Sequence, residues 1–429
     1  MSALKVAKTQ DTVELTLQLL GELFSGHSER FGVRLWDGTI WPDDRPKRAT
    51  LVLNHPGALR ATLLPGTEVA LGEAYLYNDI DIEGDFLAVF EWANELARYT
   101  SNWKNKLSIV RDLMRLPNQM NPHVSRRGPA KLSGKRHSLE RDRQAVAYHY
   151  NVSNDFFALF LGKRMVYTCA YFRSPEDSLD QAQEQKLEHI CRKLRLKPGQ
   201  RLLDIGCGWG GLVLYAAEKY GVDATGVTLS KPQVELANQR IASSGLGERC
   251  RVQLRDYREV DETYDVLVSI GMFEQVGEDQ LPVYFQHANH ILRPGGVFLN
   301  HGIARRVNEP TWDPQAFSDA YVFPDGELSP ISHTLRVAEE SGFEVRDVES
   351  LRDHYIQTLT RWVGNLENRH ADALVCVDEP TYRVWRAYMS ASEFGFRSGR
   401  LNLYQSLLFK PAGPGPSGLP LTREDWYRP

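Results

Sequence analysis

Residues 201–211 read Arg-Leu-Leu-Asp-Ile-Gly-Cys-Gly-Trp-Gly-Gly, an apolar strand that runs directly into a glycine-rich turn. The glycines Gly206, Gly208 and Gly210 allow a bound cosubstrate to lie against bare backbone, and the amides at the start of the following helix would point at it. Such a turn indicates a nucleotide-binding α/β sheet. On its own it does not separate nicotinamide and flavin proteins from other nucleoside-binding proteins.

The strand that follows decides between these classes. It runs from Asp223 to Thr228 and continues into Leu229 and Ser230. A dinucleotide site expects an acidic residue about 20 residues beyond the glycines, where it holds the ribose hydroxyls. No acidic residue ends this strand, and the glycine spacing is GxGxG rather than GxGxxG. These two features favour the nucleoside-binding turn of a methyltransferase over that of a dehydrogenase.

The composition is that of an ordinary globular protein, with 42% hydrophobic and 25% charged residues. A length of 429 residues is enough for two or three domains, and the net charge of −4 argues against a general nucleic-acid binder. No apolar run reaches the roughly 18 residues of a membrane span, and the first residues lack a signal peptide's apolar stretch. The five cysteines have no CxxC spacing, so we expect reduced cytoplasmic thiols, no disulfides and no metal site.

The first part of the chain predicts a small α+β domain over residues 1–116. Apolar periodicity predicts helices over 12–24 and 85–98, and Asp37-Gly38 predicts a hairpin between 33–36 and 39–41. Alternating runs at 49–53 and 69–77 are expected to be further strands.

Residues 117–144 change character, because prolines and glycines alternate with basic residues. One interpretation is a solvated linker, since charged runs are usually exposed. The alternative is contact with anionic phospholipid, where each basic group adds about 1 kcal/mol of binding near the surface. The basic residues are Arg126, Arg127, Lys131, Lys135, Arg136, Arg141 and Arg143.

From residue 185 onward, helices and strands alternate as in a doubly wound sheet. Helices are expected over 185–196 and 212–220, and strands over 201–205, 223–228, 264–270 and 296–301. A last strand over 401–409 is expected to close the sheet. Residues 304–335 form a long insertion of the kind that covers a substrate site. The predicted boundaries are 145–411 for this domain and 412–429 for a C-terminal tail.

Four further motifs carry a resemblance to a known family. They are Tyr-His-Tyr-Asn-Val-Ser-Asn-Asp-Phe-Phe at 148–157, Met-Val-Tyr-Thr-Cys-Ala-Tyr-Phe at 165–172, Gly-Val-Thr-Leu-Ser at 226–230 and Gly-Met-Phe-Glu-Gln-Val-Gly at 271–277. Together with the turn at 201–211, this set resembles the cyclopropane fatty acid synthases and mycolic acid methyltransferases from about residue 145 to 410. The first domain looks like the N-terminal domain of the longer, phospholipid-acting members.

The resemblance implies methyl transfer from S-adenosylmethionine to the cis double bond of an acyl chain, commonly in a membrane phospholipid. An alkene has no proton to lose beforehand, and the transfer leaves a carbocation that water would quench. A dry pocket of aromatic rings would stabilise that charge, although core packing is the plain alternative for each ring alone. The candidate rings are Tyr150, Phe156, Phe157, Tyr167, Tyr171, Phe172, Tyr321, Phe323, Tyr355, Trp362, Phe394 and Phe396.

By resemblance, the base that removes the last proton is a bound bicarbonate. The catalytic set that matches its holders is Cys169, Glu274, His301, Ile303 through its backbone, and Tyr355. This chain departs from the family pattern at two positions. Gln275 stands where the family usually has histidine, and Ser392 corresponds to a cysteine once regarded as catalytic. Neither is expected to be the base, and Gln275 leaves the product open.

The same resemblance assigns the cosubstrate contacts. Tyr167 and Thr168 would meet the amino-acid end, and Thr228 and Gln233 would meet the ribose. Asp256 and Tyr257 would lie beside the adenine. The full predicted set is Tyr167, Thr168, Leu203, Asp204, Gly206, Gly208, Gly210, Thr228, Leu229, Ser230, Gln233, Asp256 and Tyr257.

The sequence therefore predicts an α/β class I S-adenosylmethionine-dependent methyltransferase with a Rossmann-like doubly wound sheet and a smaller N-terminal α+β lipid-binding domain. The expected product is a cyclopropane, with a methylene or methyl branch as the close variant. An enzyme that N-methylates a small amine and a non-catalytic lipid-binding protein are the rival hypotheses. We expect the protein at the cytoplasmic membrane surface without nucleic acid, and the choice between monomer and homodimer stays open.

Overall fold

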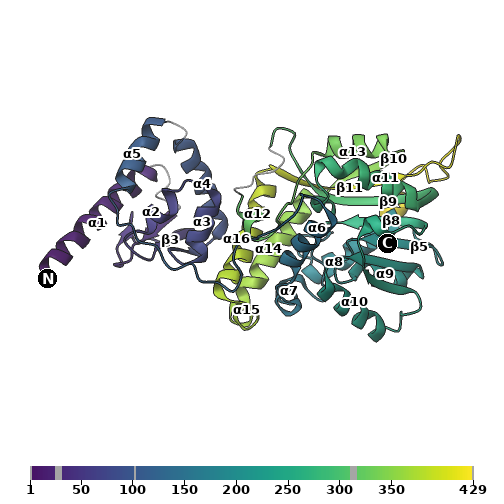
Figure 1. Cartoon of the computed structure of the whole chain (residues 1–429), viewed down its shortest axis with the longest axis horizontal. Coiled ribbons are helices and arrows are strands. Elements are labelled where there is room, and N and C mark those ends of the chain that lie inside the picture. Colours follow the sequence, from purple (N-terminus) through teal and green to yellow (C-terminus); the bar gives the residue numbers. More distant parts are fainter. Residues whose placement is uncertain (1, 25–30, 101–102, 310–315, 428–429) are drawn as a thin grey trace. The chain divides into compact units, whose positions relative to one another are not determined.

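The computed structural model covers the whole chain and describes residues 2–24, 31–100, 103–309 and 316–427 (Figure 1). It divides into two compact units, neither of which is one continuous stretch of sequence. The first unit holds Met1–Pro129, Gln315–Tyr321 and Asp378–Phe394, and the second holds Ala130–Pro314, Val322–Val377 and Gly395–Pro429. The two later segments of the first unit fall within the range that the sequence assigned to the methyltransferase domain.

A four-stranded sheet with the order β2-β1-β3-β4 forms the first unit's centre. β1 and β3 are parallel, whereas the other two pairings are antiparallel. The expected hairpin is present, because Val33 faces Trp41 across β1 and β2. The elements are α1 (Ser2–Leu23), β1 (Phe31–Arg34), β2 (Ile40–Trp41), β3 (Ala49–Leu53), α2 (Ala58–Leu63), α3 (Glu68–Leu76), β4 (Ile80–Gly84), α4 (Phe86–Thr100), α5 (Trp103–Leu113), α12 (Phe317–Tyr321) and most of α16 (Glu379–Arg397).

The predicted strand at 69–77 is wrong, because this segment forms helix α3. Thr67 caps the helix, its Oγ1 accepting a hydrogen bond from the Ala70 amide at 3.2 Å. The cap and the Ala, Leu and Glu content outweigh the apolar alternation. Gly72 makes room for a neighbouring ring, since a Cβ there would lie 2.2 Å from Phe317 Cδ2.

The second unit is built on a seven-stranded sheet with the order β10-β11-β9-β8-β5-β6-β7. Strands β5 to β9 are parallel, and β11 and β10 join antiparallel. The chain enters at β5, adds β6 and β7 on one side, and returns to add β8 and β9 on the other. Strand order therefore reverses between β5 and β8, and in such sheets ligands bind outside the carboxyl ends of the strands at this point. The doubly wound sheet predicted from the sequence is confirmed.

The elements of the second unit follow in chain order. The strands are β5 (Arg201–Ile205), β6 (Asp223–Thr228), β7 (Cys250–Leu254), β8 (Tyr264–Ile270), β9 (Leu292–Arg305), β10 (Glu344–Ser350) and β11 (Leu401–Phe409). The helices are α6 (Leu139–Tyr150), α7 (Asn154–Leu161), α8 (Leu179–Lys193), α9 (Gly211–Tyr220), α10 (Lys231–Ser243), η1 (Tyr257–Glu259), η2 (Phe273–Gln275), η3 (Glu278–Gln280), α11 (Leu281–Ile291), α13 (Ile331–Glu340), α14 (Arg352–Asn368), α15 (His370–Cys376) and α17 (Glu424–Tyr427).

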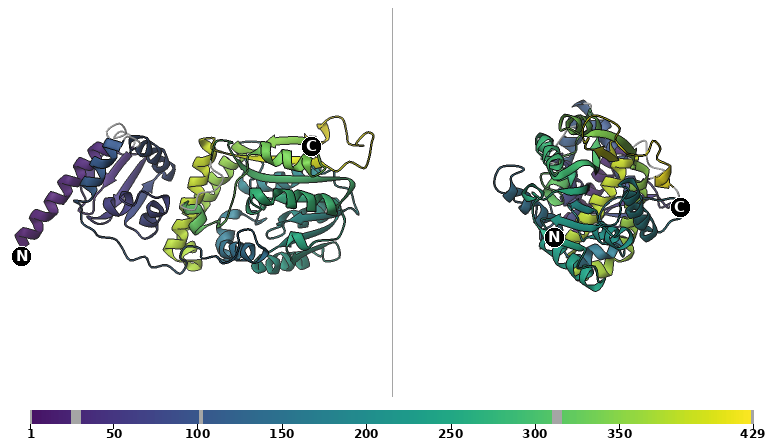
Figure 2. Two further views of the ribbon diagram at one scale, coloured as in Figure 1. Left: turned by 45° about the horizontal axis from the view of Figure 1, so that its top comes forward. Right: turned by 90° about the vertical axis from the view of Figure 1, so that its right-hand side faces the viewer.

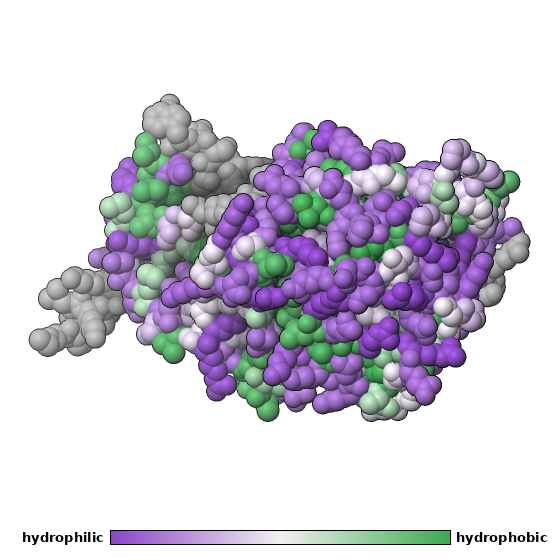
Figure 3. All heavy atoms as spheres, turned by 45° about the vertical axis from the view of Figure 1, so that its right-hand side comes forward, coloured by the Kyte–Doolittle hydropathy of each residue, from purple (hydrophilic) through white to green (hydrophobic). Residues whose placement is uncertain are grey.

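Helices cover both faces of this sheet, as two views of the ribbon show (Figure 2). Successive β5 residues point to opposite faces, so Leu202 joins a core cluster with α8, α9 and α10, whereas Leu203 joins one with α11 and α13. Burial on both faces explains the continuously apolar sequences of the central strands. The outer surface drawn in Figure 3 is mostly hydrophilic, with scattered hydrophobic residues.

The predicted strand at 401–409 is present as β11, but it does not close the sheet. β10 pairs antiparallel with it on the outside, with Val348 opposite Ser406. The sequence did not indicate β10, because it reads Glu-Val-Arg-Asp-Val-Glu-Ser, and charged residues of this kind suit an edge strand. Within the insertion expected at 304–335, residues 310–315 lie outside the described residues. Among the described helices, none combines the length and apolarity that crossing a bilayer requires.

Candidate active site

The glycine turn after β5 has the backbone geometry that its sequence demands. Gly206, Gly208 and Gly210 have φ values of +80°, +55° and +76°, a region that favours glycine. The Gly206 and Cys207 amides both donate to the Val227 carbonyl, at 2.9 and 3.1 Å, which ties the turn to β6. α9 begins directly at Gly211 without a side-chain cap. Its first amides are therefore available to a ligand at the edge of the sheet.

Asp204 is the penultimate residue of β5. Its side chain is buried, and its Oδ1 has no hydrogen-bond partner among the described residues. Burial raises the pKa of this carboxyl to about 7, and the positive charge of Lys186 partly opposes the shift. Lys186 is itself 1% exposed and donates from Nζ to Thr168 Oγ1 at 3.0 Å. Burial lowers its pKa to about 8. An unpartnered buried carboxyl is costly unless a ligand satisfies it, which suits a contact with a polar cosubstrate.

The raised pKa of Asp204 leads to a pH-dependent stability. The pKa is about 7 in the folded chain against an ordinary value of 3.8, so ionising Asp204 costs folding free energy. This cost is absent below the unfolded pKa, grows as the pH rises, and is complete above the folded pKa. We therefore expect the free energy of unfolding of Asp204→Asn, relative to that of the parent, to rise by about 3 kcal/mol as the pH goes from about 5 to about 8 in the absence of ligand.

Chemical denaturation at the two pH values measures this difference. The exposed residue Asp261 supplies the control, since Asp261→Asn should follow the parent at both. An equal difference between Asp204→Asn and the parent at both pH values would show that Asp204 ionises freely in the folded chain.

The end of β6 presents two further polar groups without partners. Thr228 Oγ1 donates to Gln233 Oε1 at 2.7 Å, which fixes the Gln233 amide and leaves its buried Nε2 without an acceptor among the described residues. Ser230 Oγ is also buried without a partner in the described part of the chain, whereas Leu229 is half-buried beside it. The two predicted ribose contacts, Thr228 and Gln233, thus lie together, and Gln233 Nε2 and Ser230 Oγ can donate to hydroxyl oxygens of a ligand.

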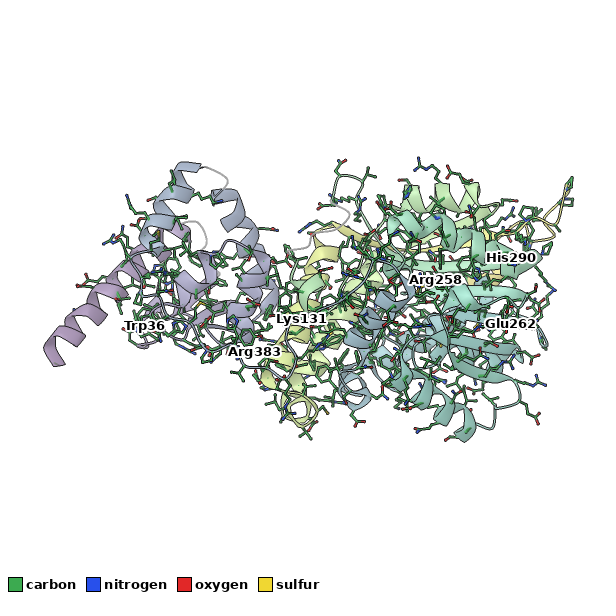
Figure 4. All side chains as sticks on the ribbon, viewed as in Figure 1. Trp36, Lys131, Arg258, Glu262, His290 and Arg383 are labelled. Atoms are coloured by element: carbon green, nitrogen blue, oxygen red, sulfur yellow. The ribbon has the colours of Figure 1, made fainter. Side chains whose placement is uncertain are left out.

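Asp256 and Tyr257 follow β7, as predicted, and Arg258 already engages the carboxylate. Its Nε lies 2.8 Å from Asp256 Oδ1, and its Nη2 lies 2.8 Å from Oδ2. Arg258, labelled in Figure 4, also bonds Asp142 of α6 at 2.7 Å. The Tyr257 ring packs on Tyr284, with centroids 5.5 Å apart. After β7, Tyr257 therefore provides an aromatic ring for the predicted adenine contact, whereas the carboxylate of Asp256 is held in an ion pair with Arg258.

The five residues expected around an anion fall into two groups. Glu274 is in η2, after β8, and its Oε1 accepts a 2.7 Å hydrogen bond from the Ile303 amide of β9. His301 lies two residues earlier on the same face of β9. Cys169 Sγ lies 3.9 Å from the Leu351 carbonyl, which also accepts from the Tyr355 amide at 3.0 Å. β11 links the groups, because the Leu351 amide donates to Leu403, which stands opposite Ile303.

Two of these five residues have an open polar atom, by which we mean a buried polar atom without a hydrogen-bond partner among the described residues. Glu274 Oε2 and His301 Nε2 are both buried and without a partner among the described residues. Burial raises the pKa of Glu274 to about 7 and lowers the pKa of His301 well below its usual range. Burial also raises the pKa of the Cys169 thiol far above its usual value, so this group stays protonated. At neutral pH the Cys169 thiol and the His301 ring are therefore uncharged, whereas Glu274, with a pKa of about 7, can present Oε2 as an acceptor to a ligand that carries an O–H group.

Aromatic rings connect the glycine turn to Tyr355, and we call this set the ring row. Neighbouring centroids lie 5.0 Å apart for Trp209–Phe157, 5.6 Å for Phe157–Tyr167, 5.2 Å for Tyr167–Trp362, 6.1 Å for Trp362–Tyr355 and 4.8 Å for Tyr355–Phe396. Four of the six side chains are at most 1% exposed, namely Trp209, Phe157, Trp362 and Phe396.

The remaining candidate rings divide between neighbours of the row and residues elsewhere. Tyr150 and Phe156 both contact Phe157, and Phe323 stacks on His149 at 3.8 Å. Tyr171 and Phe172 stack on His354 instead. Tyr321 and Phe394 belong to the first unit, where the Tyr321 hydroxyl donates to Glu73 at 2.6 Å and Phe394 stacks on Phe90. Of the twelve candidate rings, these four therefore lie outside the ring row and its direct neighbours.

Part of the basic segment has a structural role that neither sequence interpretation predicted. Arg136 pairs with Glu327 at 2.7 Å, and Arg141 makes two bonds to the buried Asp325, at 2.5 and 2.9 Å. These guanidinium groups hold residues 325–327 against the start of α6. They are engaged within the second unit, so they do not present free charge to a lipid surface.

Three buried polar residues near the site were missed by sequence reasoning: Lys186 and Lys193 of α8, and Gln405 of β11. The charged pattern of α8 indicates an amphipathic helix and does not reveal which lysines face inward. Gln405 lies in an apolar strand, and this isolated polar residue was the available signal. Gln275 lies in η2 directly after Glu274, and Ser392 lies in α16 within the first unit.

Comparison with known proteins gives consistent matches. A family model described as mycolic acid cyclopropane synthetase matches residues 137–406. A probable fatty acid methyltransferase from Pseudomonas putida is 39% identical over 401 residues, which are 92% of this chain and 96% of that protein. Tuberculostearic acid methyltransferase UfaA1 from Mycobacterium tuberculosis is 32% identical over 390 residues, 88% of this chain and 87% of that protein.

A solved structure of the same family is also similar to this chain. The mycolic acid cyclopropane synthase CmaA1, complexed with SAH and CTAB, is 34% identical with a TM-score of 0.60. That match covers 62% of this chain and 98% of the other. The range matched by the family model contains the glycine turn, the ring row and the residues around Glu274.

Proposed function

Because this chain belongs to the mycolic acid cyclopropane synthetase family and is an S-adenosylmethionine-dependent methyltransferase, we propose that it methylates the cis double bond of unsaturated acyl chains in membrane phospholipids. The proposed product is a cyclopropane. The observation that carries this proposal is the ring row, which runs from the glycine turn to Tyr355 with most of its rings buried.

The ring row suits the charge that the reaction creates. When a double bond attacks a sulfonium methyl group, a C–C bond forms, the C–S bond breaks, and a positive charge develops on the acyl chain. Ring faces such as those of Tyr167 and Trp362 stabilise a cation, and they do so most strongly where water is excluded. Trp362 is fully buried. These rings would therefore both favour the transfer and protect its product from water.

A proton must then leave, and the residues present suit a bicarbonate ion as its acceptor. Glu274 Oε2 and His301 Nε2 are open polar atoms in a buried setting, which a small hydrogen-bonding anion would satisfy. Bound there, bicarbonate would supply a base that neither the protonated Cys169 thiol nor the buried His301 ring provides. Glu274, His301, the Ile303 backbone, Cys169 and Tyr355 are the proposed holders, and Ile303 already positions Glu274 through its amide.

A methylene- or methyl-branched product is the second candidate. The similar proteins from Pseudomonas putida and Mycobacterium tuberculosis are named as methyltransferases rather than cyclopropane synthases. Gln275 directly follows Glu274 and replaces the histidine usual in the family pattern. A change beside a proposed holder of the bicarbonate would alter where the proton leaves, and so which product forms.

The first unit is proposed to contact the membrane. Apolar side chains are unusually exposed along α5 and the residues after it, with Leu107 and Met114 at 60% and Val124 at 76%. Arg111 and Arg115 lie among them, with side chains 71% and 62% exposed, and both pair with Asp112, at 3.0 and 3.4 Å. The two guanidinium groups together exceed that carboxylate by one positive charge. Exposed apolar and basic groups along α5 and the residues that follow it suit the interface of an anionic lipid bilayer.

The direct test supplies S-adenosylmethionine labelled in its methyl group together with vesicles of monounsaturated phospholipid. Saturated phospholipid vesicles, free monounsaturated fatty acid and a mixture of small amines serve as parallel substrates. We expect label in the acyl chains of the unsaturated lipid alone, released by transesterification. Label only on added amines would replace the proposal with an N-methyltransferase, and label in free fatty acids but not phospholipids would change the substrate class.

A further inference from the structure

We infer that Gln405, held in place by Lys193, fixes His301 in the tautomer with its proton on Nε2 and makes this histidine a hydrogen-bond donor. The tautomer follows from contacts within the second unit. Its use, presenting N–H to the proposed anion, rests on the proposed function. Gln405 is thus a positioning residue, which acts through His301.

Gln405 sits directly opposite His301 where β11 pairs with β9, and both side chains are at most 1% exposed. Its Oε1 accepts a hydrogen bond from Lys193 Nζ at 2.9 Å. An ammonium group has donors only, so it selects the amide oxygen and turns the amide nitrogen the other way. That nitrogen lies 3.1 Å from His301 Nδ1. Nδ1 must therefore accept, and the proton of a neutral ring lies on Nε2.

Lys193 is a firm anchor for this chain of hydrogen bonds. Its ammonium group is 1% exposed, bonds the Glu349 carboxylate, and lies 5.5 Å from the Trp426 ring centre. Although burial opposes it, hydrogen bonds from His189 and Lys193 lower the pKa of Glu349 to about 2. The carboxylate is therefore charged at neutral pH. The C-terminal segment contributes as well, because Trp426 is buried over this position.

His301 is held neutral by its surroundings. Burial is the main cause that lowers its pKa, the charges of Lys186 and Lys193 add to the effect, and Glu349 acts against them. A neutral ring with a proton on Nε2 has no lone pair on that atom. His301 can then donate to an anion but cannot take a proton from the acyl chain. This excludes His301 as the base and leaves the proton transfer to another group.

Histidine tautomers are read directly by NMR of protein labelled with ¹⁵N in its histidine rings, recorded without any ligand. The His301 signals are identified by their loss in His301→Gln. We expect the Nδ1 resonance in the range of an unprotonated ring nitrogen and the Nε2 resonance in the protonated range. A protonated Nδ1 in the parent protein would overturn the inference, whatever the enzyme's substrate proves to be.

Gln405→Glu tests whether Gln405 sets the tautomer. A carboxylate accepts from both Lys193 and His301, so the proton should move to Nδ1 and the two nitrogen resonances should exchange ranges. Gln253→Glu, the same change on β7 of this sheet, should leave the His301 signals unchanged. If Gln405→Glu keeps the parent pattern, Gln405 does not control His301.

The same variant separates the tautomer from the proposed function. Losing one N–H donor to an anion should raise the KM for bicarbonate about tenfold and leave the Kd for S-adenosylmethionine unchanged. An exchanged tautomer with an unchanged KM would refute the donor role of His301 in the anion site. The assignment of Gln405 as the residue that orients the ring would stand.

Discussion

Glu274→Gln should lower kcat by about 100-fold or more and leave the Kd for S-adenosylmethionine unchanged. The substitution keeps the size of the side chain and an oxygen that accepts from the Ile303 amide, which lies 2.7 Å from Oε1 in the parent. It replaces the open Oε2 with an amide nitrogen that cannot accept. The proposed anion would lose a partner and turnover would fall, whereas the glycine turn would be untouched.

Glu262→Gln provides the matched control, since Glu262 lies at the surface and pairs with Arg255. Turnover is measured from methyl transfer into unsaturated phospholipid, and cosubstrate affinity by calorimetry. Parent-like turnover of Glu274→Gln would remove this carboxyl group from the mechanism. A weakened Kd with unchanged kcat would instead place Glu274 at the cosubstrate.

Gly206→Ala should weaken S-adenosylmethionine binding by about 100-fold or more, a cost of roughly 3 kcal/mol. Gly206 has a φ of +80°, and a Cβ built there would lie 2.5 Å from Met272 Cβ. The added methyl group forces either the turn or residues 271–273 to move. Either movement distorts the amides that would face the ligand, so binding should suffer more than folding.

Gly199→Ala separates backbone strain from this collision. Gly199 has a nearly identical φ of +79°, and nothing lies within 4 Å of the position that its added methyl group would occupy. Both variants carry the strain of a left-handed backbone, about 1–2 kcal/mol, but only Gly206→Ala alters the turn. Calorimetry with S-adenosylmethionine should show a parent-like Kd for Gly199→Ala. Equal affinities for both variants would mean that the turn after β5 does not hold the cosubstrate.

The second unit could be predicted from the sequence because its signals are local and strong. Buried parallel strands are apolar throughout, as at 264–270, and the glycines at 206–210 occur where the backbone requires positive φ. The secondary structure of the first unit was harder to predict. α3 presents an apolar alternation that imitates a strand, and its Thr67 cap is a single-residue signal.

The sequence predicted which residues belong to the candidate site, but it did not predict the hydrogen bonds that position them. Family motifs point to Glu274 and His301, yet only the fold reveals that the Ile303 amide positions Glu274 and that Gln405 meets His301. The ion pair between Arg141 and Asp325 likewise joins residues 184 positions apart in the sequence. Such long-range pairings depend on tertiary structure, which composition and periodicity do not encode.

In the proposed reaction an acyl double bond receives the methyl group, and the transferred methyl group then loses one hydrogen. The most direct measurement uses S-adenosylmethionine with a trideuterated methyl group and a monounsaturated phospholipid, followed by mass spectrometry and NMR of the released acyl chains. We expect a cyclopropane in which the ring carbon that came from the methyl group retains two deuterium atoms. Acyl chains without deuterium after complete consumption of the cosubstrate would contradict it.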